Sequence, residues 1–96
     1  MKVKIQSVKF DADEKLIAYV EGKMNRLERF HDGIATAEVT LSLENVVKDS
    51  HKKVAVRLEI PGESLFAERS ASTFEHALDL SIDALKSQIA KAKEKF

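Results

Sequence analysis

Two stretches of the sequence alternate between apolar and polar residues, and they constrain the fold more than any other feature. They are residues 35–44 (ATAEVTLSLE) and residues 53–60 (KVAVRLEI), with an apolar residue at every second position. A period of two places successive side chains on opposite faces of a β-strand. Both stretches therefore predict strands of a sheet that has one buried face and one face in water.

Two further strands are predicted on weaker alternation. Residues 2–8 place Val3 and Ile5 on one face, and residues 64–70 place Leu65 and Ala67 inward with Phe66 outward. Residues 61–63 (PGE) predict a tight turn, in which Gly62 tolerates a positive φ. Residues 45–53 (NVVKDSHKK) predict a long charged loop between the two central strands, with Lys48, Lys52 and Lys53 able to contact a polyanion.

Two amphipathic helices are predicted from apolar residues that recur at helical spacing. The first stripe comprises Leu16, Ile17, Val20, Met24, Leu27 and Phe30. The second comprises Phe74, Ala77, Leu78, Ile82, Leu85 and Ile89, and it can continue to Phe96. Each helix therefore has one face to bury and one face to leave in water.

The predicted ends of the helices follow from capping residues. Asp11 with Glu14, and Ser72 with Glu75, have the spacing of a capping box at a helix start. Gly33 follows the first stripe and could take the left-handed conformation that closes a helix.

The element order β-α-β-β-β-α predicts an α+β, two-layer sandwich. Both helices would pack on one face of a four-stranded mixed sheet. A right-handed parallel crossover would join the first two strands, and hairpins would join the rest. The 96 residues predict a single domain, 1–96.

The charges cancel overall but are not evenly spread. Sixteen basic residues balance sixteen acidic ones. Residues 1–10 contain three lysines and no acid, and residues 84–96 contain four lysines against one glutamate. No apolar run is long enough to span a bilayer, and the N-terminus does not resemble a signal peptide, so we expect a cytoplasmic protein without membrane contact.

The residue types give little support for catalysis. The chain has no cysteine, and its three histidines (His31, His51 and His76) are not at metal-ligand spacing. Three glycines leave no phosphate-binding loop. We therefore expect no enzyme activity, no metal, no cofactor and no small-molecule substrate, with a small hydrolase as the least favoured alternative.

Basic residues on the two helices offer a different kind of site. Lys23 and Arg26 are neighbours on one helix face, and Arg29 continues their row. Lys86 and Lys93 share one face of the second helix, and Lys91 shares another with Lys95. Acidic residues interrupt the two rows, so a salt-bridged surface without a ligand is an open alternative; these are Glu21, Glu28, Asp79 and Asp83.

Five segments in order resemble the ribosome hibernation promoting factor family, which includes the ribosome-associated inhibitor proteins. They are KMNRLERFHD, AEVTLSLE, IPGESLFAE, TFEHALDLSIDAL and QIAKAKEK. The resemblance covers nearly the whole chain, and the chain looks like a short form of the family. The family fold has the same element order and is partly similar to the double-stranded-RNA-binding domain (dsRBD-like).

The resemblance implies a function that the residue pattern alone does not. Family members bind the small ribosomal subunit and its rRNA under stress or in stationary phase. They occupy the channel of mRNA and tRNA, so they compete with both and inhibit translation sterically, and some promote inactive ribosome dimers. The alternative that we keep open is a protein-interaction module of the same fold that docks a partner on its open sheet face.

The resemblance also assigns residues to rRNA binding. Lys23 and Arg26 match the basic positions of the family's first helix, and three lysines match a K-x-K-x-K pattern near the end of the second. Lys86 stands between Ala84 and Ser87, where many relatives carry basic residues. The predicted rRNA-binding residues are Lys23, Arg26, Arg29, Lys86, Lys91, Lys93 and Lys95.

Overall fold

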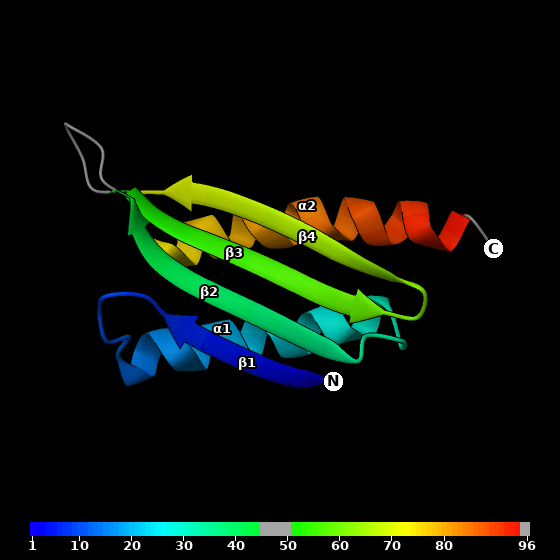
Figure 1. The fold of residues 1–96 in the computed structure, drawn as a ribbon, viewed down its shortest axis with the longest axis horizontal. Helices are drawn as coiled ribbons and strands as arrows, with labels where there is room; N and C mark the ends of the chain where they lie inside the picture. The colour runs from blue at the N-terminus through cyan, green and yellow to red at the C-terminus, as the bar shows by residue number, and fades with distance from the viewer. Residues whose placement is uncertain (45–50, 95–96) are drawn as a thin grey trace.

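The chain folds into one sheet and two long helices (Figure 1). The computed structural model describes residues 1–44 and 51–94, with side chains through residue 92. The elements are β1 (Lys2–Ser7), α1 (Glu14–Leu27), the 3₁₀ turn η1 (Glu28–Phe30), β2 (Thr36–Glu44), β3 (His51–Ile60), β4 (Glu63–Ala71) and α2 (Phe74–Glu94). The predicted order of strands and helices is confirmed.

The four strands lie in the order β1-β2-β3-β4. β1 pairs with β2 in parallel, and the other two pairs are antiparallel. In one row across the sheet, Ile5 lies opposite Val39, Val39 opposite Val56, and Val56 opposite Ala67. This mixed sheet is the one that the sequence predicts, with the parallel pair where a helix joins two strands.

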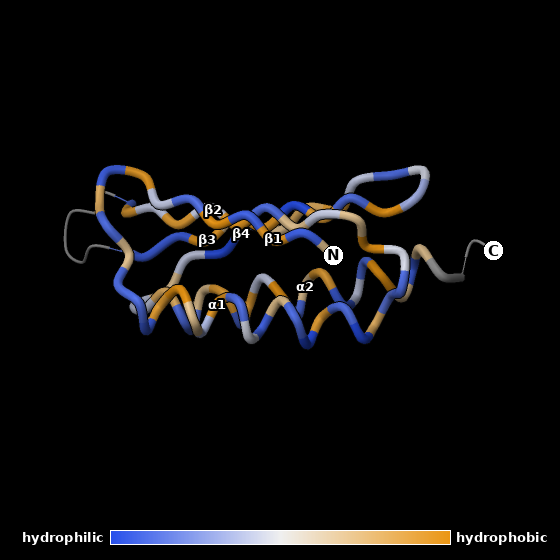
Figure 2. The backbone as a smooth tube through the Cα atoms, turned by 90° about the horizontal axis from the view of Figure 1, so that it is seen from below, coloured by the Kyte–Doolittle hydropathy of each residue, from blue (hydrophilic) through white to orange (hydrophobic). Residues whose placement is uncertain are grey.

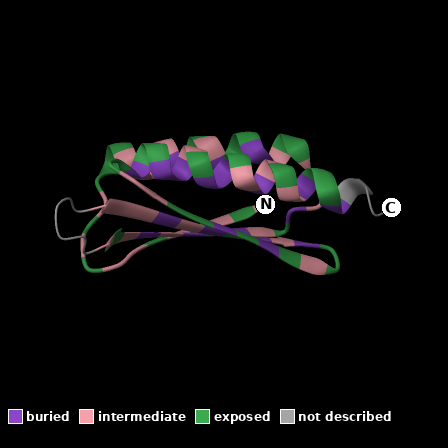
Figure 3. Ribbon diagram, turned by 90° about the horizontal axis from the view of Figure 1, so that it is seen from above, coloured by how far each residue is buried: buried purple, intermediate pink, exposed green. Residues whose placement is uncertain are grey.

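Both helices cover the same face of the sheet, and the other face is open (Figures 2 and 3). They run in the same direction, so their C-terminal ends lie at the same end of the molecule (Figure 1). The buried side chains come from both layers, and burial falls on the predicted stripes. The largest fully buried ones include Met24, Leu27, Leu41, Leu58, Leu78 and Leu85. The α+β sandwich is therefore confirmed.

The start of α1 differs from the prediction. Asp13, not Asp11, caps the helix, and its carboxylate accepts from the Leu16 N–H at 2.8 Å. The helix begins late because the preceding segment is a turn that contacts α2. Lys9 takes a positive φ of 65°, and the Phe10 ring stacks on Phe74 at 5.0 Å. The predicted capping box is wrong, although a carboxylate still caps the helix.

The start of α2 is also shifted by one residue. The Thr73 hydroxyl accepts from the His76 N–H at 3.1 Å, so Thr73 caps the helix in place of Ser72. Glu75 remains in the first turn, where its negative charge interacts favourably with the helix dipole. A hydroxyl cap was predicted correctly, but its position was wrong.

The end of α1 contradicts the predicted glycine cap. The helix passes into η1, and the only positive φ values among the described residues belong to Lys9 and Gly62. Gly33 is needed for space, because a Cβ there would lie 2.7 Å from His31 Cε1 and 3.0 Å from Pro61 Cδ. Phe30, predicted to be buried, is 45% exposed because η1 turns it away from the core.

The predicted loop between the central strands is shorter than expected. β3 already begins at His51, so Lys52 and Lys53 belong to a strand, and Leu43 at the end of β2 is exposed rather than buried. Lys48 and the rest of residues 45–50 lie outside the described residues. Within the described part of the chain, neither helix is long and apolar enough to cross a membrane.

Candidate functional site

The two helices meet along a seam that is marked by charged and aromatic side chains. Lys23 Nζ on α1 lies 3.4 Å from Asp79 Oδ1 on α2. The lysine side chain is 32% exposed and the aspartate 46%, so water screens the pair. Asp79, one of the acids that interrupt the predicted basic rows, is therefore a direct partner of the predicted site residue Lys23.

Tyr19 completes this contact. Its hydroxyl donates to both oxygens of Asp79, at 3.0 and 3.1 Å, and Lys23 Nζ lies 5.4 Å from its ring centroid. Burial raises the pKa of the Tyr19 hydroxyl, and the hydrogen bond and charge of Asp79 raise it further, whereas Lys23 lowers it. Tyr19 and Asp79 together hold Lys23 in position at the surface.

Lys86 lies farther along the same seam. Its ammonium lies over the Phe30 ring, 4.6 Å from the ring centroid. This is a cation–π contact, and it holds Lys86 of α2 against the end of α1. The exposed Phe30 ring thus serves as a support for a cation.

Arg26 lies between these two contacts. It is three residues after Lys23, which puts these two side chains on the same flank of α1. It is exposed, and within the described residues no acid pairs with it. We call Lys23, Arg26 and Lys86 the seam cations.

Arg29 lies at one end of the seam, in η1. It is exposed and lines a shallow hollow of about 310 Å³ with the residues that follow it, as far as Gly33. The next residue before it, Glu28, accepts a salt bridge from the N-terminal amine of Met1 at 3.4 Å. Arg29 is therefore an exposed cation just beyond the end of α1, in a hollow that it shares with Asp32.

Lys91 lies on a different flank of α2. It is exposed and lines a hollow beside β4, with Leu65 and Gln88 among its neighbours. Five residues after Lys86, a helical position is rotated by about 140°. The structure therefore places Lys23 and Lys86 at contacts between the two helical segments, with Arg26 beside Lys23 on α1, and places Lys91 on another flank of α2. The side chain of Lys93 and all of Lys95 lie outside the described residues.

The open face of the sheet carries mixed charges. Lys4, Glu38, Arg57 and Phe66 occupy one row across the four strands. Lys53 pairs with Glu68 at 3.0 Å, and the hydrogen bond and charge of this carboxylate raise the pKa of Lys53. The acids Glu59 and Glu44 accept hydrogen bonds from Ser64 and Ser70 of β4.

The histidines lie in separate places. His31 precedes β2, and its Nδ1 accepts from the Gly33 N–H at 2.8 Å. His51 begins β3 and His76 lies in the first turn of α2. Among residues 1–44 and 51–94, no group of three or more potential ligands could hold a metal ion.

Comparison with known proteins identifies the family. The sequence profile of the sigma 54 modulation protein / S30EA ribosomal protein family matches residues 3–96. The chain belongs to this family. The resemblance predicted from sequence is thereby confirmed.

Curated relatives of this S30EA-family chain carry consistent names. It is 33% identical over 95 residues to the ribosome hibernation promoting factor of Azotobacter vinelandii. This match covers 99% of the chain and 85% of that protein. It is 33% identical over 87 residues to the ribosome hibernation promotion factor of Deinococcus radiodurans. That match covers 90% of the chain but only 46% of the relative, so the chain spans about half of that protein's length.

Solved structures have the same fold as the S30EA-family chain. The match to a ribosomal subunit interface protein from Coxiella burnetii covers 98% of this chain and 99% of that protein's chain, with a TM-score of 0.87 and 20% identity. The match to the N-terminal domain of Thermus thermophilus Protein Y covers 95% of this chain and 98% of that domain, with a TM-score of 0.80 and 27% identity.

Sequence analysis did not predict Tyr19 and Phe30 as site residues, although both contact lysines at the seam. The available signal was the i, i+4 spacing of Tyr19 and Lys23.

Proposed function

We propose that this chain is a ribosome hibernation factor that binds the small ribosomal subunit through its rRNA. In this proposal it occupies the channel used by mRNA and tRNA and inhibits translation sterically during stress or stationary phase. It acts without a chemical step and without a cofactor. The names of its relatives support the ribosome as partner, and the seam cations carry the proposed contact.

The observation that best supports the proposal is the fixed placement of the seam cations. Lys23 is held by Asp79 and Tyr19, and Lys86 is held over Phe30. Cations at fixed spacing on a rigid frame can match a row of phosphates without base-specific contacts. Binding through Lys86 then loses less side-chain entropy, because a neutral ring already partly orders that cation, whereas Asp79 orders Lys23 but also neutralises it.

The proposed binding residues extend from the seam in two directions. Arg29 continues it beyond α1, and Lys91 belongs to a second contact on the β4 side of α2. The full proposed set is Lys23, Arg26, Arg29, Lys86, Lys91, Lys93 and Lys95.

The test is cosedimentation of the purified chain with isolated small and large ribosomal subunits over a range of salt. Each phosphate contact should contribute about −0.7 to −0.9 to the slope of log affinity against log salt. We expect binding to the small subunit, with a salt dependence that corresponds to several phosphate contacts. Salt-independent binding, or equal binding to the large subunit, would contradict the proposal.

A pair of double variants locates the surface. Arg26→Glu with Lys86→Glu reverses two seam cations, and Lys4→Glu with Arg57→Glu reverses two cations of the open sheet face. Both changes alter the net charge equally. The seam variant should lose binding while the sheet variant keeps it, and the opposite result would favour the protein-interaction module docking through the sheet.

A further inference from the structure

The two edges of the sheet are treated differently. At the β4 edge, the Gln88 carboxamide of α2 contacts the backbone of Phe66, accepting from its N–H at 3.3 Å and donating to its carbonyl at 2.8 Å. A side chain there occupies the positions that an added strand would use. Such protection is a recognised way to prevent unwanted pairing at a sheet edge.

The β1 edge has no such cover among the described residues. The N–H groups of Lys2 and Val8 donate inward to the carbonyls of Ala35 and Leu41 on the β2 side, at 3.0 and 2.9 Å. By the two-residue period, the backbone groups of Val3, Ile5 and Ser7 point away from β2. None of the described side chains bonds to them.

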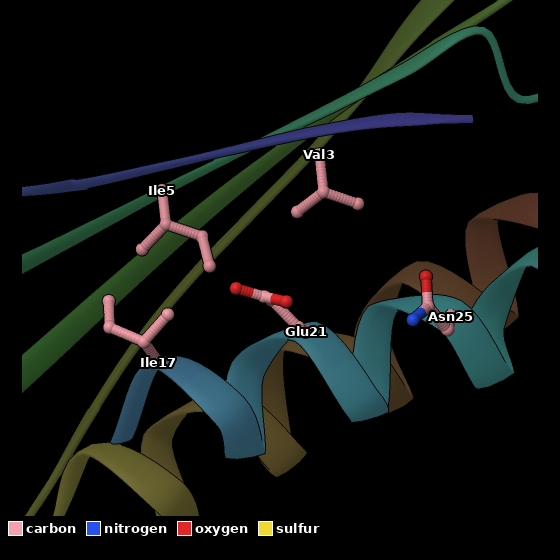
Figure 4. Close-up of a pocket in the computed structure, with 5 residues that line it drawn as sticks. All are labelled: Val3, Ile5, Ile17, Glu21 and Asn25. Atoms are coloured by element: carbon pink, nitrogen blue, oxygen red, sulfur yellow. The ribbon is translucent and has the colours of Figure 1, made fainter. Parts of the chain in front are cut away.

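A groove runs beneath this free edge. Val3 and Ile5 of β1 form one wall, and Ile17, Glu21 and Asn25 of α1 form the other (Figure 4). Its volume is about 410 Å³. The first three of these side chains are apolar and only half-buried. An open row of backbone groups therefore lies directly beside a groove that is apolar along Val3, Ile5 and Ile17 and polar along α1 at Glu21 and Asn25.

The charges near the β1 edge indicate which kind of segment could bind there. Lys2 and Lys4 are exposed on the opposite face of β1, and residues 1–10 contain no acid; Glu38 of β2 lies beside Lys4, on the side away from the free edge. The side chains of a strand added to β1 would alternate between the face that carries these lysines and the groove, where Val3, Ile5 and Ile17 offer apolar contacts and the Glu21 carboxylate disfavours another acid. We propose that the free edge of β1 binds an extended protein segment in which apolar residues alternate with Asp or Glu.

Other occupants match less well. A second copy paired through β1 would bring Lys2 and Lys4 of both chains together, with no acid among residues 1–10 to balance them. An RNA strand could contact the lysines through its phosphates and the carbonyls through its 2′-hydroxyls, but its backbone lacks the regular alternation of donors and acceptors that matches a strand edge. This inference goes beyond the proposed function and does not depend on it.

The experiment is an amide NMR titration of the full chain with a capped peptide of alternating valine and glutamate, six residues long like β1. We expect shifts, and slowed amide exchange, at Val3, Ile5 and Ser7. A peptide of alternating valine and lysine, and the glutamate peptide with a central proline, serve as controls and should bind at least about tenfold more weakly.

Two variants of the chain complete the test. Lys2→Glu with Lys4→Glu lies at exposed positions and should lose affinity for the glutamate peptide by about tenfold. Lys86→Glu with Lys91→Glu makes the same change in charge on α2 and should leave affinity unchanged. Three results would overturn the proposal: equal binding of the lysine peptide, self-association through β1 in sedimentation, or an oligonucleotide that slows exchange of the same three amides.

Discussion

The Tyr19 hydroxyl donates to the Asp79 carboxylate at 3.0 Å, and this bond joins two helices across 60 positions of sequence. The same carboxylate lies 3.4 Å from Lys23 Nζ. One acid thus holds a phenol and an ammonium at the interhelical seam. Because the acid is shared, a change at Asp79 should alter both the packing of the helices and the charge available at the surface.

The titration of Tyr19 tests this arrangement. Burial and Asp79 raise its pKa above the ordinary value of 10.0. The folded chain then holds the phenol proton to higher pH than the unfolded chain does, so the free energy of unfolding should fall as pH rises above 10.0. Tyr19 is the only tyrosine and there is no tryptophan, so tyrosinate absorbance reports it directly. Lys23→Met should raise the midpoint and Asp79→Asn should lower it; unchanged midpoints would mean that the cluster does not form.

Removing the charge of Asp79 should strengthen rRNA binding under the proposed function. Asp79→Asn keeps an oxygen for Tyr19 but releases Lys23 from its ion pair. Because a partly exposed pair contributes about 0.2–1 kcal/mol, binding to the small subunit should tighten by up to about fivefold. Glu75→Gln removes one exposed charge elsewhere on α2 and is the matched control. An equal gain in both variants would indicate a general effect of net charge.

Phe30 should matter for binding although it is not a cation. Phe30→Ala removes the ring that supports Lys86 and should weaken small-subunit binding about two- to fivefold, since exposed cation–π contacts contribute about 0.5–1 kcal/mol. Phe30→Tyr keeps the ring and should bind normally. Leu43→Ala truncates a side chain of similar exposure at the end of β2 and should have no effect in the same cosedimentation assay.

Two glycines should respond oppositely to alanine. Gly22 lies in α1, where an added Cβ meets nothing within 4 Å, so Gly22→Ala should stabilise the chain by up to about 1 kcal/mol. In Gly33→Ala the Cβ would meet His31 and Pro61, so the free energy of unfolding should fall by about 1–3 kcal/mol. Urea denaturation measures both, and equal effects would show that Gly33 is not sterically required.

Gln88 should suppress pairing at the β4 edge. Gln88→Ala frees the backbone groups of Phe66, whose side chain is itself 48% exposed. The variant should self-associate faster at high concentration than the parent chain, with little loss of stability because water replaces the lost bonds. Light scattering over time measures this, with Ser87→Ala as the control at an adjacent exposed position. No difference between the two variants would remove the protective role.

The sequence predicted the layers because binary patterning records which face is buried. The strict alternation through Val39 and Val56 fixed the inner face of the sheet, and the helical stripe through Leu78 and Leu85 fixed that of α2. The capping positions were missed by one or two residues. Several nearby polar residues could cap each helix, and the choice was made by tertiary contacts such as the stack of Phe10 on Phe74.

The candidate site was less accessible to prediction. Helical spacing correctly joined Lys23 to Arg26, but it could not say how α1 and α2 are aligned, so neither the Lys23–Asp79 pair nor the Lys86–Phe30 contact could be foreseen. It also could not show that Lys91 turns toward β4. These relations depend on the packing of one helix against another, and no local pattern encodes it.

Because α1 and α2 run in the same direction, their helix dipoles point the same way along this neutral chain (Figure 1). Acids lie at the N-terminal ends of the helices, at Asp13, Glu14 and Glu75, while Arg26 and Arg29 lie near the C-terminal end of α1. Each set neutralises the partial charge of the nearby helix end, but the side chains reach farther into solvent than the backbone does. For an approaching polyanion the two ends of the molecule are therefore not equivalent, and the orientation of approach would affect the rate of productive encounter.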